Sequence, residues 1–188
     1  MTTRRQWLVT ASIAAALVLV VVGATRLLGH QVEAVEAGSK APDFHALPVA
    51  LGVHRTDAPA KGIADYQGKV VLLNIWATWC DPCRSEMPSI EKLHEELGPE
   101  GLKVLAISID QPGMEPAIRE FAQQYGLTFE ILHDAAGKIE LDYQTSGFPE
   151  TFVIGKDGII RKRVIGATDW AAEPQKALIR QLLAEPGG

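Results

Sequence analysis

The chain holds two cysteines, Cys80 and Cys83, separated by two residues. A continuous apolar run over residues 70–76 leads into them and is typical of a strand covered on both faces. Apolar residues at helical spacing follow, at Met87, Ile90, Leu93 and Leu97. At a strand-to-helix junction, helix N–H groups and the helix dipole favour a thiolate on the first sulfur. The pair therefore indicates reversible dithiol–disulfide chemistry, with Cys80 as the nucleophile and Cys83 as the thiol that resolves the mixed disulfide.

Two other roles for the cysteines are less favoured. A structural disulfide over so short a ring constrains the unfolded chain little. A zinc site needs four ligands, and the five histidines show no spacing that would make them partners of the pair. We therefore expect a redox-active Cys80–Cys83 disulfide, with no metal and no bound cofactor. The pair His133-Asp134 is interpreted as the solvated end of a strand.

Charge and length exclude some classes of partner. The chain has 188 residues and a net charge of −5. Outside the first five residues it has no cluster of Lys and Arg that could follow a phosphate backbone. We therefore expect no nucleic-acid partner, and one domain of ordinary size plus an appendage.

The appendage is the N-terminal segment. Arg4 and Arg5 precede an uncharged, largely apolar stretch over residues 6–25, and about 20 apolar residues span a bilayer as a helix. Positive charge before the stretch favours a cytoplasmic N-terminus, which places the rest of the chain on the far side of the membrane. A cleaved signal peptide remains an alternative. The predicted organisation is a transmembrane segment over 1–28, a linker over 29–40 and a globular domain over 41–188.

The pattern along the domain predicts an α/β fold. Expected strands are 70–76, 102–109, 129–132, 151–154 and 159–165, the last two joined by a turn at Gly155-Lys156-Asp157-Gly158. Expected helices follow Cys80 up to residue 97 and cover 115–125, part of 135–142, and 170–184. Short strands or a hairpin are expected over 47–62. Early strand–helix–strand units followed by a hairpin and a helix predict a mixed sheet with helices on both faces.

Several segments resemble the TlpA/ResA/CcmG group of membrane-anchored, thioredoxin-like proteins of the bacterial periplasm. They are Trp-Ala-Thr-Trp-Cys-Asp-Pro-Cys-Arg-Ser-Glu-Met-Pro at 76–88, Ala-Pro-Asp-Phe at 41–44, Gly-Lys-Val-Val-Leu-Leu-Asn at 68–74 and Gly-Phe-Pro-Glu-Thr-Phe-Val-Ile at 147–154. The resemblance covers about residues 41–184. It implies a thioredoxin-like fold and a dithiol–disulfide active site.

The resemblance also implies roles for residues outside the cysteine pair. Pro149 is expected to follow a cis peptide bond, which would place the Phe148 backbone beside the disulfide to pair with an extended substrate segment. Position in the sequence, and not the resemblance, suggests the roles of the two tryptophans. Trp79, next to Cys80, is expected to form a partly exposed docking surface, whereas Trp76 is expected in the core. Glu86, one helical turn beyond Cys83, is expected to exchange a proton with it. Asn74 stands where cytoplasmic thioredoxins carry a buried aspartate, which leaves Glu86 as the nearer proton carrier.

The partners follow from the same family. Its members mostly reduce protein disulfides, often of apocytochrome c, and receive electrons from a membrane thiol donor of the DsbD/CcdA kind. We therefore expect a single-pass protein of the inner membrane with its catalytic domain in the periplasm. The alternative is thiol-based copper handling, or reduction of the copper site of a cytochrome oxidase subunit, because Cu(I) favours thiolates. A peroxiredoxin is discounted, since the sequence lacks a Pro-x-x-x-Thr-x-x-Cys pattern.

Overall fold

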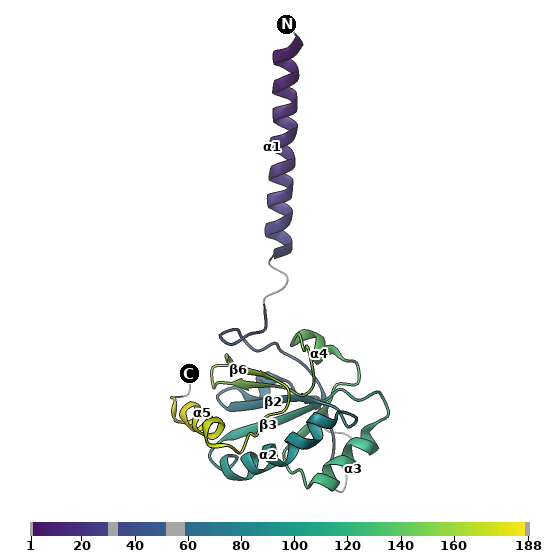
Figure 1. Ribbon diagram of the computed structural model, residues 1–188, viewed down its shortest axis with the longest axis vertical. Coiled ribbons are helices and arrows are strands. Elements are labelled where there is room, and N and C mark those ends of the chain that lie inside the picture. Colours follow the sequence, from purple (N-terminus) through teal and green to yellow (C-terminus); the bar gives the residue numbers. More distant parts are fainter. Residues whose placement is uncertain (1, 30–33, 52–58, 187–188) are drawn as a thin grey trace. The chain divides into compact units, whose positions relative to one another are not determined.

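The computed structural model describes residues 2–29, 34–51 and 59–186 (Figure 1). They form two compact units, divided between Ala34 and Val35, which are described separately. The predicted linker falls partly on residues 30–33, and the strands or hairpin expected over 47–62 fall partly on 52–58. Both of those ranges lie outside the described residues. Residues 35–40, within the predicted linker, belong to the second unit, where Val35 is buried in a core cluster.

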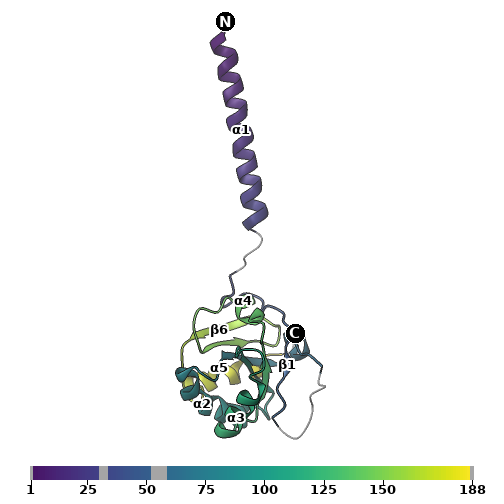
Figure 2. The same ribbon diagram turned by 90° about the vertical axis from the view of Figure 1, so that its right-hand side faces the viewer.

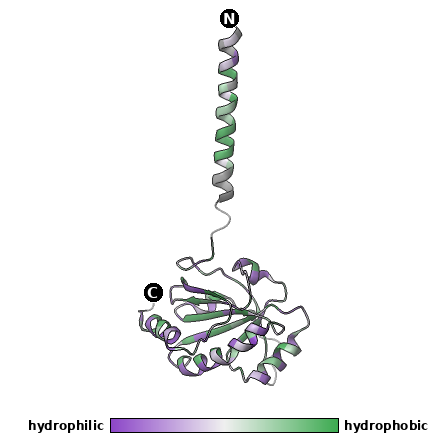
Figure 3. Ribbon diagram, in the orientation of Figure 1, coloured by the Kyte–Doolittle hydropathy of each residue, from purple (hydrophilic) through white to green (hydrophobic). Residues whose placement is uncertain are grey.

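The first unit is a single helix, α1 (Thr2–Gly29). Its segment Gln6–Ala24 is long and apolar enough to cross a membrane. Figure 3 shows the hydrophobic colour concentrated along the middle of this helix. A signal sequence near an N-terminus has the same properties, so the helix agrees with both interpretations of the appendage.

The second unit is built on one six-stranded sheet of order β1-β4-β3-β2-β5-β6. The strands are β1 (Leu47–Pro48), β2 (Val70–Trp76), β3 (Leu102–Ser108), β4 (Glu130–His133), β5 (Glu150–Ile154) and β6 (Ile160–Ile165). Strands β2, β3 and β4 are parallel to one another, whereas β5 is antiparallel to β2, β6 to β5, and β1 to β4. The sheet is therefore mixed, as the sequence predicts.

Helices cover both faces of this sheet. They are α2 (Asp81–Leu97), α3 (Glu115–Tyr125), α4 (Lys138–Asp142) and α5 (Glu173–Ala184), with a 3-10 helix η1 (Ile63–Tyr66). Helices α2, α3 and α5 pack on one face in a single core cluster, and α4 and η1 pack on the other (Figures 1 and 2). The expected α/β fold with helices on both faces is confirmed.

Strand β2 lies at the centre of this arrangement. It pairs with β3 on one side and β5 on the other, and all seven of its residues are buried. Successive side chains of a strand point to opposite faces. Leu72 and Trp76 accordingly enter the core beneath α2, and Leu73 and Ile75 enter the core beneath α4. A strand covered in this way is apolar except where a buried polar side chain has hydrogen-bond partners, as Asn74 does, which explains the almost uninterrupted run of apolar residues in the sequence.

Helix α3 ends where the sequence predicts, because Gly126 closes it. Gly126 has φ of 63°, in the left-handed region, and its N–H donates to the carbonyls of Ala122 and Gln123. A Cβ at this position would meet no atom within 4 Å. The cost of a side chain here is therefore conformational and not steric.

We expect Gly126→Ala to lower the free energy of unfolding by about 1 kcal/mol, because an L-residue is strained in the left-handed region. Denaturant unfolding measures the loss. Gly126→Asn is the matched control, since asparagine tolerates this conformation better than alanine. An alanine variant as stable as the asparagine variant would contradict the explanation.

Candidate active site

The two cysteines form a disulfide at the N-terminus of α2. The S–S distance between Cys80 and Cys83 is 2.09 Å, and Cys80 is the N-cap residue of the helix. The Cys83 backbone N–H donates to the Cys80 sulfur at 3.2 Å. Cys80 is 5% exposed and Cys83 is fully buried. The first sulfur thus has both the helix N–H contact and the better access, which suits a nucleophile.

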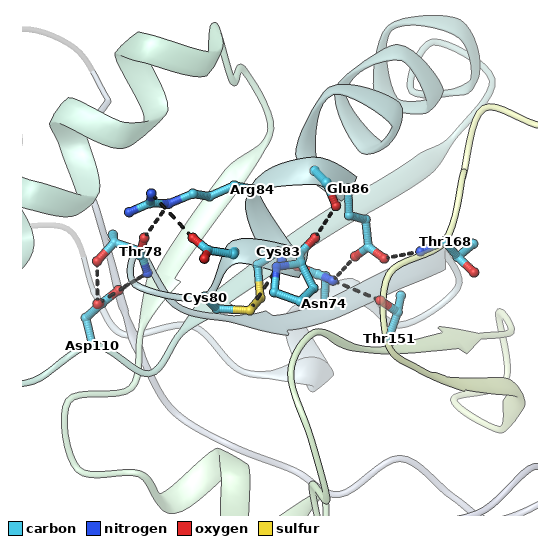
Figure 4. Close-up of a disulfide and its surroundings, with 12 residues drawn as sticks. Asn74, Thr78, Cys80, Cys83, Arg84, Glu86, Asp110, Thr151 and Thr168 are labelled. Carbon is cyan, nitrogen blue, oxygen red and sulfur yellow. Dashed lines mark hydrogen bonds and ion pairs between the residues drawn. A yellow bond between two sulfur atoms is a disulfide. The ribbon is translucent and has the colours of Figure 1, made fainter.

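A buried carboxylate holds the segment that precedes Cys80. Asp110, just beyond β3, accepts hydrogen bonds from the Thr78 hydroxyl at 2.7 Å and the Thr78 backbone N–H at 3.0 Å. The Ser108 hydroxyl donates to the same carboxylate at 2.7 Å. Figure 4 shows this group on one side of the disulfide. Asp110 is 1% exposed, so these bonds anchor the turn between β2 and α2 from inside the protein.

An exposed cation lies over the same turn. The Arg84 Nε donates to the Thr78 carbonyl at 3.0 Å, and its Nη1 lies 3.6 Å from the Asp81 carboxylate. Arg84 thus offsets the negative charge of Asp81, which stands between the two cysteines. Because both side chains are largely exposed, solvent screens this pair.

On the other side of the disulfide lies Glu86 (Figure 4). Its Oε1 accepts from Asn74 Nδ2 at 2.8 Å, and its Oε2 accepts from the backbone N–H of Thr168 at 2.8 Å. The same Asn74 nitrogen donates to the Thr151 hydroxyl at 2.8 Å. Glu86 therefore sits one turn beyond Cys83 on α2, with contacts to β2 and to the segment that follows β6. Only 2% of its surface is exposed.

Burial sets the protonation of this carboxyl group. Removal from water raises the pKa of Glu86 to about 7, although the hydrogen bonds from Thr168 and Asn74 act in the lowering direction. A carboxyl group with a pKa near neutrality can both accept and release a proton under physiological conditions. The geometry thus gives Glu86 the property that its expected role requires.

An aromatic surface flanks the disulfide. Trp79 is 59% exposed, and its ring meets that of Phe148 edge-on, with centroids 6.0 Å apart. The Phe148–Pro149 peptide bond is cis, as expected. Within the described part of the chain, no residue hydrogen-bonds the Phe148 backbone. Trp76 is fully buried, which confirms its place in the core.

Three contributors to the site were missed by sequence reasoning. Asp110 could have been found from its position, because it follows the carboxyl end of a parallel strand next to β2. Thr168 contributes a backbone N–H, and Thr151 contributes a hydroxyl from β5, for which the sequence has no signal. The interpretation of His133-Asp134 as a solvated strand end is wrong, because both side chains are buried. The His133 ring lies between the Glu115 carboxylate at 3.1 Å and the Asp110 carbonyl at 2.8 Å.

Among the described residues, no three His, Cys, Asp or Glu side chains gather where they could hold an ion.

Comparison with known proteins agrees with the site. Residues 37–163 match the AhpC/TSA family. The thiol-disulfide oxidoreductase ResA of Oceanobacillus iheyensis is 38% identical over 130 residues, which cover 69% of this chain and 65% of that protein. ResA of Geobacillus thermodenitrificans is 34% identical over 165 residues, which cover 87% of this chain and 90% of that protein. The chain thus spans just under two thirds of the first relative and nine tenths of the second.

The fold has solved counterparts as well. A crystal structure of a thiol:disulfide interchange protein, DsbE, from Chlorobium tepidum superposes with a TM-score of 0.68 at 26% identity, and covers 79% of this chain and 99% of that one. The fold, the cysteine pair at the helix N-terminus and these matches lead to one conclusion. The chain belongs to the AhpC/TSA family and, within it, to the ResA-like thiol–disulfide oxidoreductases.

Proposed function

We propose that this protein reduces disulfides of partner proteins outside the cytoplasm, with Cys80 and Cys83 as its dithiol. The observation that carries the proposal is the position of the disulfide, at the N-terminus of α2 beside the exposed Trp79 ring and the partly buried Phe148 ring. A protein substrate that rests on these rings would present its own disulfide to Cys80.

The reaction is two successive thiol–disulfide exchanges. The Cys80 thiolate attacks one sulfur of the substrate disulfide, which forms a mixed disulfide and releases the other sulfur as a thiolate. The Cys83 thiolate then attacks the Cys80 sulfur and releases the second substrate sulfur. Two electrons pass to the substrate, its two thiolates take up protons, and the Cys80–Cys83 disulfide forms.

Glu86 supplies the base for the second exchange. Cys83 is fully buried and must lose its proton before it can attack. Glu86 is the carboxyl group one helical turn away, and its raised pKa matches proton transfer near pH 7. In the reverse direction, protonated Glu86 returns the proton to Cys83 when the disulfide is reduced.

The substrate contacts extend from the aromatic rings to the backbone. The N–H and C=O of Phe148, which make no hydrogen bond to the described residues, can pair with an extended segment on either side of the substrate cysteine, as a strand adds to a sheet. Trp79 then covers the apolar side chains of that segment. Apocytochrome c, whose cysteines lie in an unfolded chain, is a substrate with this chemistry.

The apolar N-terminal helix supports a location at the membrane. We propose that α1 remains as a single-pass anchor in the cytoplasmic membrane and that residues 41–188 act in the periplasm. The periplasm is kept oxidising, so a reductant there needs electrons from across the membrane. An anchor would raise the effective concentration of the domain near a membrane thiol donor of the DsbD/CcdA kind.

Copper handling through the same thiols is supported less well. A copper carrier would be expected to add soft ligands beside the cysteines. Met87, the nearest methionine in sequence, is fully buried in the core beneath α2. We therefore prefer the reduction of disulfides.

The reduction potential of the Cys80–Cys83 couple tests the direction of transfer. We expect a value nearer the roughly −270 mV of thioredoxin than the about −120 mV of DsbA. Equilibration of the protein with glutathione or dithiothreitol measures it, with Cys80→Ser as the control that shows no couple. A value near the oxidising limit would make this protein a disulfide donor.

Substitution of the cysteines separates their roles. Cys83→Ser should accumulate a mixed disulfide with a protein substrate, because no thiol remains to resolve it, whereas Cys80→Ser should form none. Non-reducing electrophoresis after mixing with an oxidised substrate detects the adduct. An adduct formed by Cys80→Ser alone would reverse the assignment.

The raised pKa of Glu86 makes the stability of the oxidised protein depend on pH. The folded carboxyl group keeps its proton up to about pH 7, whereas the unfolded one loses it near pH 4.5. The contribution of Glu86 to the free energy of unfolding is therefore fully present below pH 4.5. It falls by up to about 3 kcal/mol as the pH rises to about 7. Glu86→Gln should remove this loss. The free energy of unfolding of the variant, relative to that of the wild type, should therefore rise from pH 5 to pH 8. Unfolding at both pH values measures the difference, with the exposed Glu95→Gln on the same helix as the control.

Glu86→Gln should also slow the reaction. Without the carboxyl group, transfer of the Cys83 proton loses its acceptor, and we expect a fall of about 100-fold in the resolution step at pH 7. The deficit should shrink as pH rises, since hydroxide deprotonates Cys83 directly. Rapid mixing with a disulfide substrate across pH 6–9 gives the profile. A variant that keeps the wild-type profile would exclude Glu86 as the base.

A further inference from the structure

From its place on β6, Arg163 contacts three other parts of the domain. Its Nε contacts the Glu150 carboxylate, its Nη2 donates to the Gln144 carbonyl at 2.8 Å, and its Nη1 donates to the Val35 carbonyl at 2.8 Å. Nη1 also lies 3.1 Å from the Glu36 carboxylate. The side chain is 12% exposed. The planar guanidinium group has donors pointing in these several directions at once, which a lysine lacks.

Glu150, the partner of Arg163, is fully buried and uses both carboxylate oxygens. Oε1 accepts from Arg163, and Oε2 accepts from the backbone N–H of Ser146 at 2.9 Å. A buried charge is tolerated only when it is paired and hydrogen-bonded. The pair therefore holds Ser146 at a set distance from β5 and β6.

These bonds determine the shape of the segment 144–149, which we term the substrate loop. It is held at Gln144 by Arg163, at Ser146 by Glu150, and at Pro149 by the Gly166 N–H, which donates to the Pro149 carbonyl at 2.7 Å. Phe148, between the last two of these points, has its ring against Trp79. The Arg163–Glu150 pair is thus connected to the aromatic surface through the backbone of this loop.

We propose that Arg163 and Glu150 are positioning residues for substrate binding, which hold the substrate loop so that the Phe148 backbone and ring face the partner protein. This inference rests on the proposed function, since it assumes that protein substrates bind beside Phe148. The ion pair makes no contact with the disulfide and takes no part in the exchange of electrons. Its loss should therefore weaken binding of an extended substrate and leave the chemistry of the cysteines intact.

The test compares two disulfides of different size on the full chain. One is a short peptide with an intramolecular disulfide between two cysteines in an extended segment, and the other is the small aromatic disulfide 5,5′-dithiobis(2-nitrobenzoate). Arg163→Lys keeps the positive charge beside Glu150 but loses the hydrogen bonds from the guanidinium group to the Gln144 and Val35 carbonyls. We expect it to raise KM for the peptide about tenfold, with kcat, the rate with the small disulfide and the reduction potential unchanged. Arg161→Lys is the matched control on the same strand, because Arg161 pairs with Asp157 at the surface.

A second variant guards against misfolding of the first. Glu150→Gln offers only one acceptor oxygen to the two donors that the carboxylate binds, so either Arg163 or Ser146 loses its bond. It should give the same rise in KM. Hydrogen exchange of the Ser146 amide should accelerate in both variants, and this readout needs no substrate.

The outcomes are distinct. Equal losses with the peptide and the small disulfide would overturn the inference, because the pair would then act on the cysteines themselves. An unchanged KM for the peptide, despite faster exchange at Ser146, would overturn it as well. If the wild-type protein fails to reduce the peptide while it reacts with the small disulfide, the proposed function itself fails, and the inference fails with it.

Discussion

The burial of β2 on both faces is the constraint on which the rest of the structure depends. This strand lies between β3 and β5 and has no exposed residue, so it cannot shift without exposing apolar surface. The chain leaves it directly into the turn that ends at Cys80. A rigid strand thus determines where the helix α2 begins, and the start of α2 determines where the first sulfur lies. The position of the reactive pair is therefore set by a strand that is buried along its whole length.

Two buried carboxylates support the turn and the helix in different ways. Asp110 accepts hydrogen bonds from Thr78 and Ser108 and keeps the turn in register with the end of β3. Glu86 also accepts hydrogen bonds, but burial outweighs them and raises its pKa to about 7. The protein therefore contains, on opposite sides of the disulfide, one acid whose hydrogen bonds hold the backbone and one acid whose proton affinity is matched to neutral pH.

A third buried carboxylate, Glu150, differs from both because it is paired with a cation. Arg163 neutralises its charge, and the pair connects the sheet to the loop that carries Phe148. Such pairs contribute little net stability, because removing two charges from water costs about as much as their attraction returns. The ion pair and its hydrogen bonds nevertheless form in only one arrangement of the side chains. They can therefore hold the loop in the one conformation that presents the Phe148 backbone to a partner.

Much of the secondary structure and the position of the disulfide could be predicted from the sequence. The apolar run of β2, the helical spacing after Cys83 and the glycine that ends α3 are local patterns, and each element formed where those patterns predict. The cysteine spacing and the resemblance of residues 147–154 indicated the disulfide and the cis peptide bond. These features are local because they depend on neighbouring residues along the chain.

The tertiary structure decided what depends on residues far apart. Glu86 was a candidate from its place one turn beyond Cys83, but its raised pKa comes from burial in the packed structure, which outweighs the hydrogen bonds that it accepts from Asn74 and the Thr168 backbone. His133 and Asp110 are buried only because β4 and β3 lie side by side, and the sequence around His133 resembles an exposed strand end. Arg163 lies on β6, a strand at the edge of the sheet, yet its side chain contacts a buried carboxylate 13 residues away. Periodicity shows which face of an element is apolar, whereas the partner of a buried charge is determined by the packing of elements that the local pattern does not specify.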